Sequence, residues 1–191
     1  MGEVDDKLSS AGRKRLEFKC LPVRIKDKRG RPIQVRAYEA ADFGALHKMY
    51  DTFEPKGLEC GLPPPDHQVR LRWLSYVVSE LFNILAIYKD RVIGHSALDL
   101  LGSPFCPEYL IFIQKGFRNL GIGTALSTII KKAAEEAGCE KVVLTVRTAN
   151  RRAIKVFEKV GFAFCGGIDT YRDMELELKR PGAGCPKLCG K

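Results

Sequence analysis

The 191-residue chain contains no apolar run long enough to cross a bilayer, which requires about 20 consecutive apolar residues. Its first residues are charged and polar, so we expect no signal peptide there. Its seven cysteines are irregularly spaced and do not suggest the disulfide framework of a small secreted domain. These absences argue against a membrane-spanning protein and a disulfide scaffold, and they predict one domain in the reducing cytoplasm with no membrane partner.

The sequence also lacks the two commonest phosphate-binding loops. Residues 118–124, Arg-Asn-Leu-Gly-Ile-Gly-Thr, follow an apolar run at 109–113 and open an amphipathic run at 122–137. This order predicts a turn from a strand into a helix. No lysine follows Gly123, as a Walker loop requires, and Leu126 stands where a dinucleotide fingerprint has its third glycine.

The turn at 118–124 is nevertheless a predicted anion site. The first N–H groups of a helix have no partner within the helix, and the helix dipole is positive at that end. Gly121 and Gly123 have no Cβ, so a phosphate can approach the backbone closely. We therefore expect this turn to hold a phosphorylated cofactor.

A second landmark covers residues 150–162, after a buried strand predicted at 140–146. Asn150 is a predicted helix N-cap, and Gly161 is a predicted helix stop. Between them, apolar residues recur at the spacing of one helix face. The pattern is N-x-x-A-x-x-x-F-E-K-x-G-F.

These two landmarks, in this order and separated by one helix and one strand, resemble those of the GNAT superfamily of N-acetyltransferases. The resemblance covers about residues 32–179, and the pattern V-R-A-Y-E-A-A-D at 35–42 is loosely similar to bacterial protein-lysine acetyltransferases. It implies a single-domain α/β (α+β) fold, with a mixed, mostly antiparallel sheet and helices on both faces. Residues 1–31 would form a basic N-terminal extension with a strand hairpin, and 180–191 a tail containing glycine, proline and cysteine.

The remaining patterns fit this plan. Helices are predicted at 40–53 and 69–81, separated by a proline-rich loop at 61–65. Further strands are predicted at 21–25, 33–36, 84–88, 92–98, 162–164 and 174–178.

The resemblance implies acetyl-CoA as co-substrate and a primary amine as acceptor. The N–H groups of Leu120 to Thr124 would hold the pyrophosphate, Arg151 or Arg152 would pair with the 3′-phosphate, and an N–H near Phe112 or Ile113 would polarise the thioester carbonyl. The expected cofactor-binding residues are Phe112, Ile113, Arg118, Asn119, Leu120, Gly121, Ile122, Gly123, Thr124, Asn150, Arg152 and Phe157.

Catalysis requires a base, because a lysine amine with a pKa of about 10.4 is mostly protonated at neutral pH. Glu108, at the start of the cofactor strand, is the candidate base, and Asp99 and His95 are its rivals.

The resemblance also implies a general acid that protonates the departing thiolate, and the chain departs from the family at this position. Phe157 stands where many members carry a tyrosine that protonates the departing thiolate. Tyr109, Tyr171 or water could replace it, with Tyr109 preferred. A thiol with a pKa of about 8.5 is already a fair leaving group, so activity need not be lost.

The acceptor is left open by the sequence. Loops at 53–67 and 166–171 are expected to form its pocket, in which Glu54, Glu59 and Asp66 would attract an amine. The alternatives are a protein lysine or N-terminus, a small amine, or no acceptor at all in a regulatory acyl-CoA-binding module.

The formal net charge of +9 predicts a solvated basic face that partly serves the polyanionic cofactor. We do not expect nucleic acid as a partner, and a homodimer is left open. We expect no metal, because the thiols of Cys185 and Cys189 alone cannot complete a tetrahedral zinc site.

Overall fold

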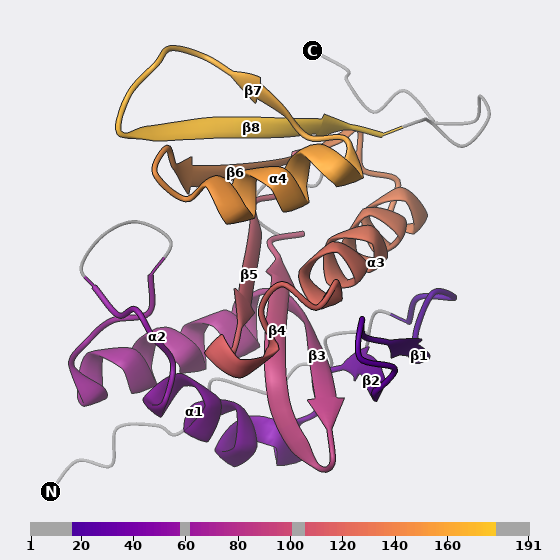
Figure 1. The fold of residues 1–191 in the computed structure, drawn as a ribbon, viewed down its shortest axis with the longest axis vertical. Helices are drawn as coiled ribbons and strands as arrows, with labels where there is room; N and C mark the ends of the chain where they lie inside the picture. Colours follow the sequence, from indigo (N-terminus) through magenta and orange to yellow (C-terminus); the bar gives the residue numbers. More distant parts are fainter. Residues whose placement is uncertain (1–16, 58–61, 101–105, 179–191) are drawn as a thin grey trace, which may run out of the picture.

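The computed structural model describes residues 17–57, 62–100 and 106–178. Its order of elements follows the predicted one (Figure 1). The strands are β1 Val23–Lys26, β2 Pro32–Ala37, β3 Phe82–Tyr88, β4 Arg91–Leu98, β5 Tyr109–Ile113, β6 Lys141–Arg147, β7 Ala163–Cys165 and β8 Tyr171–Glu177. The helices are α1 Phe43–Asp51, α2 His67–Glu80, α3 Ile122–Glu136 and α4 Arg151–Val160, with 3-10 turns η1 Ala40–Asp42 and η2 Lys115–Phe117.

The strands form two sheets. The first has the order β1-β2-β3-β4-β5, the second has the order β6-β8-β7, and every neighbouring pair of strands is antiparallel. A parallel bridge between Glu108 and Val143 joins them, with the Val143 N–H 3.0 Å from the Pro107 carbonyl. Beyond this bridge β5 and β6 diverge (Figure 1). The predicted mixed, mostly antiparallel architecture is confirmed.

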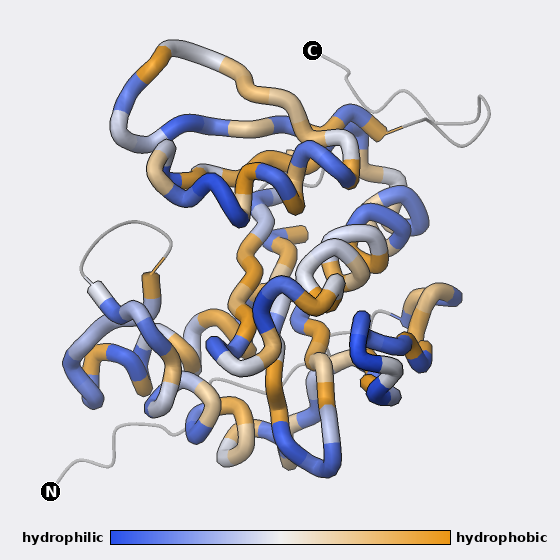
Figure 2. Tube along the Cα trace, viewed as in Figure 1, coloured by the Kyte–Doolittle hydropathy of each residue, from blue (hydrophilic) through white to orange (hydrophobic). Residues whose placement is uncertain are grey.

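Helices cover both faces of the first sheet, because its residues alternate between two cores. Ile84 and Ala86 of β3 belong to the core that also contains Leu126 of α3, while Leu85 packs with Leu46 of α1 and Leu74 of α2. Figure 2 shows the hydrophobic residues concentrated along the central strands. β5, the strand that leads to the glycine turn, likewise places Tyr109 in the first core and Phe112 in the second.

Two details of the helices differ from expectation. The predicted helix at 40–53 divides at residue 42, where Asp42 accepts the Glu39 N–H and pairs with Arg36 at 2.6 Å. The buried face of α2 includes the charged Arg70, which is 4% exposed, beside Leu74 and Val77. Arg70 is tolerated there because it donates hydrogen bonds to the carbonyls of Pro64 and Pro65, at 2.9 Å each. It thereby fixes the loop before α2.

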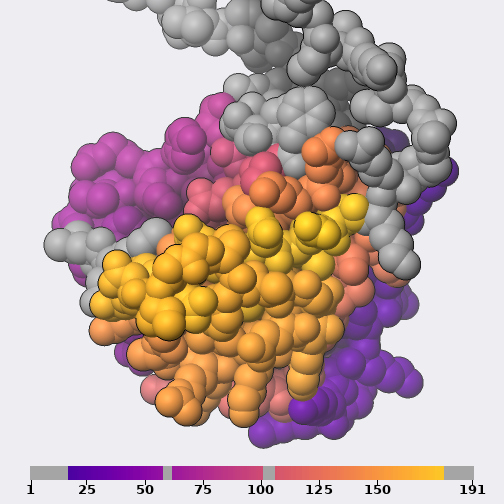
Figure 3. All heavy atoms as spheres, turned by 90° about the horizontal axis from the view of Figure 1, so that it is seen from above, coloured from indigo at the N-terminus to yellow at the C-terminus, as the bar shows by residue number. Residues whose placement is uncertain are grey.

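The N-terminal hairpin is continuous with the first sheet. β1 pairs with β2 from Val23 to Lys26, and its turn lies beside the start of α3. In Figure 3 the indigo N-terminal residues lie against the orange surface of the second half of the chain. The basic segment at 13–15 and the cysteines 185 and 189 fall outside the described residues.

Within the described ranges, no helix combines the length and the apolar character that a membrane span requires.

Candidate functional site

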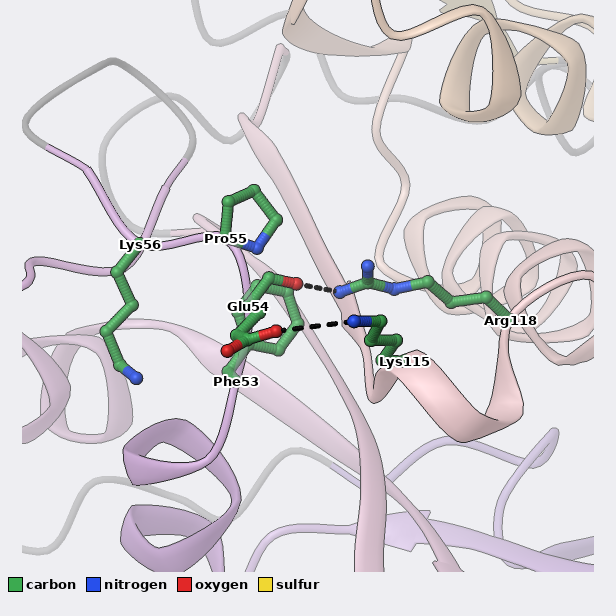
Figure 4. A pocket seen from close by; sticks show the side chains of 6 residues that line it. All are labelled: Phe53, Glu54, Pro55, Lys56, Lys115 and Arg118. Atoms are coloured by element: carbon green, nitrogen blue, oxygen red, sulfur yellow. Dashed lines mark hydrogen bonds and ion pairs between the residues drawn. The ribbon is translucent and has the colours of Figure 1, made fainter.

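A cavity of about 750 Å³ lies where β5 and β6 diverge. Its walls are residues 109–113 of β5, 144–147 of β6, the glycine turn and the first turns of α4. The two landmarks of the sequence, about thirty residues apart, therefore face one cavity. A shallower hollow adjoins it and shares Phe53, Pro55 and Arg118 with it (Figure 4).

The backbone of β5 offers hydrogen-bonding groups to this cavity. In an antiparallel pair, successive N–H groups point to opposite edges of the strand. The Gln114 N–H bonds to Ile93 of β4 at 3.0 Å, and the register pairs Phe112 with His95. The N–H of Phe112 therefore points toward β4, while those of Ile111 and Ile113 point toward β6. This geometry favours Ile113 over Phe112 as the donor to an oxyanion.

The glycine turn has the conformation that its glycine requires. Gly121 is the N-cap of α3 with φ 86°, and Asn119 has φ 63°. The first hydrogen bond of α3 runs from the Ala125 N–H to the Gly121 carbonyl at 3.0 Å, which leaves the N–H groups of residues 122–124 without a partner within the helix. A Cβ added to Gly123 would lie 3.7 Å from the Val156 side chain, an ordinary van der Waals distance, so the start of α3 lies beside α4 at this point.

Every charged residue among the described residues that line the cavity is a cation. They are Lys28, Arg118, Arg147, Arg152, Lys155 and Lys159. Such a lining concentrates a polyanionic ligand, because it creates a positive potential inside a low-dielectric hollow. Arg152 lines the cavity as predicted, whereas the alternative Arg151 does not.

The side chain of Arg118 is fixed by protein groups. Its Nε donates to the Ile113 carbonyl at 2.8 Å, a terminal nitrogen donates to the Glu54 carbonyl, and its guanidinium lies 5.0 Å from the centre of the Phe53 ring (Figure 4). Burial and the nearby Arg152 lower its pKa from the usual value. Arg118 therefore ties the turn to β5 and to the α1–α2 loop.

Tyr109 is largely buried and lines the cavity. Its hydroxyl lies 2.9 Å from Ser127 Oγ, which donates to the Gly123 carbonyl at 2.9 Å. Because Ser127 uses its only proton there, Tyr109 donates its own proton to Ser127. Burial raises the pKa of Tyr109 to about 12. Its ring meets Phe157 edge-on at 6.1 Å, and Phe157 packs in the core and also lines the cavity.

The three candidate bases have different environments. Glu108 is exposed and lies at the bridge between the sheets, one residue before the cavity lining begins. The Asp99 N–H donates to the Glu108 carbonyl at 2.9 Å, so Asp99 lies at the same end of the strands. His95 is fully buried, its Nδ1 is 2.6 Å from the Tyr50 hydroxyl, and burial lowers its pKa to about 3. An acceptor amine therefore has no access to His95, and that alternative is wrong.

His95 is instead part of a buried network. The Asn83 amide nitrogen donates to the Val77 carbonyl at 2.9 Å, which fixes its oxygen toward His95 Nε2 at 2.8 Å. An oxygen there accepts, so Nε2 carries the proton and Nδ1 accepts from Tyr50. The network thus holds a neutral imidazole between α1, β3 and β4.

We expect stability to fall in acid because of this imidazole. The pKa of His95 is about 3 in the fold and 6.5 in the reference state, so the unfolded chain binds the proton more readily. The stabilisation is complete above pH 6.5 and is lost as the pH falls from there toward 3. Between pH 7 and pH 5 the free energy of unfolding should fall by about 2 kcal/mol from this group. Urea denaturation at both pH values measures it.

The matched variant is His95→Gln, which cannot titrate and should lose this part of the pH dependence. NMR of the wild-type imidazole provides a second readout, and a ring that titrates above pH 6 would contradict the expectation.

The expected acceptor loops are only partly placed. Of the three acidic residues expected there, Glu54 lies 3.5 Å from Lys115, and Asp66 caps α2 by accepting the Val69 N–H at 2.8 Å. Glu59 falls outside the described residues. Two of the three carboxylates thus have structural partners.

Several cavity residues were not identified from the sequence. Lys155 and Lys159 follow Arg152 at three and seven positions, so a helical projection of α4 could have found them. Lys28 belongs to a hairpin turn predicted as solvated, and no local pattern signals its place. Thr145, which also lines the cavity, bonds to Asp173 of β8 at 2.8 Å.

Comparisons with known proteins agree with this geometry. Residues 46–162 match the model of the acetyltransferase (GNAT) family. A curated relative, N-alpha-acetyltransferase MAK3 of Arabidopsis thaliana, is 29% identical over 87 residues, which cover 41% of this chain and 44% of the relative. The chain therefore spans less than half the length of this curated relative.

Solved structures share the fold. The GNAT domain of PAT from S. lividans has a TM-score of 0.73 at 18% identity, covering 82% of this chain and 97% of that one. The phosphinothricin acetyltransferase of Sinorhizobium meliloti, solved with acetyl-CoA, has a TM-score of 0.64 at 18% identity, with coverages of 81% and 94%. Because the family model covers more than half of the chain and the site has the matching architecture, this protein belongs to the GNAT family of acetyltransferases.

Proposed function

We propose that the protein transfers an acetyl group from acetyl-CoA to a primary amine by direct attack, and that the acceptor is a protein lysine or a protein N-terminus. The observation that carries this proposal is the cavity between β5 and β6, with its glycine turn and with cations as the only charged side chains among the described residues that line it. A pyrophosphate-bearing ligand fits such a lining, and the structures of relatives with acetyl-CoA support the same ligand.

Each part of the cavity has one task in this proposal. The N–H groups of residues 120–124 bind the pyrophosphate, and of these residues Gly121, Gly123 and Thr124 line the cavity. Asn119 shapes their turn, and Arg152 pairs with the 3′-phosphate. The Ile113 N–H stabilises the developing oxyanion, since it points away from β4. Asn150 holds the start of α4 by accepting the Ala153 N–H at 3.3 Å. Acetyl-CoA supplies the activated acyl group, and the protein supplies position and proton transfer.

Glu108 is the proposed base. None of the described residues that line the cavity is a carboxylate, so the amine proton has to leave through a group at the rim or through water. Glu108 is exposed, lies at the bridge between the two sheets and directly precedes Tyr109, which lines the cavity. Asp99 is the rival at the same end.

Tyr109 is the proposed acid. Replacing it with phenylalanine should lower kcat about tenfold, less than the usual contribution of a general acid, because the thiolate is a fair leaving group. The dissociation constant of CoA should not change, since the ring remains in place. Stopped-flow thiol release and calorimetry separate the two quantities. If kcat of the Tyr109→Phe variant stayed within twofold of the wild type, water rather than Tyr109 would protonate the departing thiolate.

The choice of acceptor has some support from the relatives. The Arabidopsis relative is named for N-terminal acetylation. A small amine is the second candidate, because a spermidine N-acetyltransferase chimera shares the fold with a TM-score of 0.59. Four described cysteines carry free thiols, which supports a reducing, cytoplasmic compartment.

One assay tests the proposal. The purified protein is given acetyl-CoA with lysine peptides, N-terminal peptides, polyamines, amino acids and aminoglycosides, and free thiol is measured. We expect turnover with peptides. Turnover with a small amine alone would show that the acceptor is a small amine and not a protein. CoA binding without any turnover would indicate a regulatory module.

A further inference from the structure

We propose that Lys28, in the turn between β1 and β2, binds the pyrophosphate of acetyl-CoA, so that a segment outside the family-matched residues completes the cofactor site. The inference depends on the proposed function, because it assumes that the cavity holds acetyl-CoA. Lys28 lies well before residue 46, where the family match begins.

The hairpin turn is attached to the glycine turn through the backbone. The Lys28 N–H donates to the Leu120 carbonyl at 3.0 Å. Leu120 directly precedes Gly121, the N-cap of α3. The hydrogen bond therefore holds Lys28 beside the turn whose N–H groups would receive the pyrophosphate.

The side chain of Lys28 lines the cavity. A Cβ added to Gly121 would lie 3.9 Å from Lys28 Cγ, so the aliphatic stem lies in contact range of the space beside that glycine. On α4, Arg152 and Lys155 line the same cavity. A compact ammonium group on a flexible stem suits a phosphate oxygen, because it acts as a point charge with three donors.

The hairpin is rigid enough to place this charge in advance. Asp27 is 5% exposed, and its Oδ1 accepts the N–H groups of Arg29 and Arg31 at 2.9 and 3.0 Å. Arg31 pairs with Asp27 Oδ2 at 2.7 Å, and its guanidinium lies 4.5 Å from the centre of the Phe117 ring. Phe117 belongs to η2, which directly precedes the glycine turn. The hairpin and the glycine turn are thus held together at a second point.

Because Lys28 lies beside Gly121, we expect its ammonium group to bind the pyrophosphate of CoA and not the 3′-phosphate. The N–H groups at the start of α3 have no partner within the helix and form an anion site, and Lys28 lies next to them. Lys28 should therefore act equally on CoA and on dephospho-CoA, which keeps the pyrophosphate and lacks the 3′-phosphate.

The test compares Lys28→Ala with Arg29→Ala by calorimetry against both compounds. Arg29 is the matched control, because it is an exposed cation in the same turn and does not line the cavity. Lys28→Ala should raise both dissociation constants about five- to tenfold at low salt, and less at 0.5 M salt because of screening. Arg29→Ala should stay within twofold of the wild type, and Lys28→Arg should retain most of the affinity.

Equal affinities of the Lys28→Ala and Arg29→Ala variants, with matching thermal melts, would overturn the inference. Weakening of CoA alone would assign Lys28 to the 3′-phosphate and would overturn it as well. Failure of the proposed function has a different signature, because the wild-type protein itself would then bind neither compound.

Discussion

Gly121→Asp is expected to weaken CoA binding by at least about a hundredfold, which corresponds to roughly 3 kcal/mol of binding free energy. The new carboxylate would stand at the N-cap of α3, beside the N–H groups proposed to hold the pyrophosphate. It would repel the phosphates and accept hydrogen bonds from the N–H groups that would otherwise bind them. Calorimetry with CoA measures the loss.

The matched control is Gly138→Asp, because it separates the effect on the cavity from the effect on the backbone. Gly138 has φ 80°, close to the 86° of Gly121, and follows the other end of α3. Both variants place an aspartate in a left-handed conformation, which destabilises the fold by about 1 kcal/mol. Only the Gly121 variant should lose CoA affinity. If both variants bound CoA equally well, the glycine turn would not be the pyrophosphate site.

Glu108→Gln is expected to lower kcat/KM for a peptide acceptor by about a hundredfold at pH 7, the usual contribution of a general base. The amide keeps the size of the side chain but cannot accept the ammonium proton. Because a free lysine amine no longer needs a base, the deficit should shrink as the pH approaches the amine pKa of about 10. An N-terminal acceptor, with a pKa of about 8, should show the same recovery near pH 8.

The pH at which the deficit shrinks therefore also distinguishes the two proposed acceptors. Asp99→Asn is the comparison, since Asp99 lies at the same end of the strands and was the rival base. Loss of activity in Asp99→Asn with normal activity in Glu108→Gln would reverse the assignment. A Glu108→Gln deficit that does not change with pH would point to a structural role at the bridge between the sheets.

Local signals in the sequence were sufficient for the backbone of the site. Gly121 and Gly161 both have positive φ in the structure, at 86° and 109°, and Asn150 caps α4. Each of these depends on the chemistry of one residue and its immediate neighbours, so no tertiary contact is needed to predict it. The predicted turn, its helix and the landmark at 150–162 follow from such local rules.

Properties that depend on distant neighbours could not be predicted in this way. His95 lies on a strand whose pattern does not say whether a histidine is buried, and contacts with Tyr50 and Asn83 decide that it is neutral. Arg118 lines the cavity, but the carbonyl of the α1–α2 loop that holds its side chain comes from a distant part of the sequence.

The sequence by itself determined that this chain makes a glycine turn at a helix N-terminus and an acyl-CoA landmark one strand later. The tertiary structure decided which other groups surround that turn. β5 and β6 diverge after the Glu108–Val143 bridge and open a cavity, and the hairpin brings Lys28 into it from about ninety residues away. The charges that line a cavity depend on which segments pack together in three dimensions. The residues next to Lys28 in the sequence do not indicate that packing.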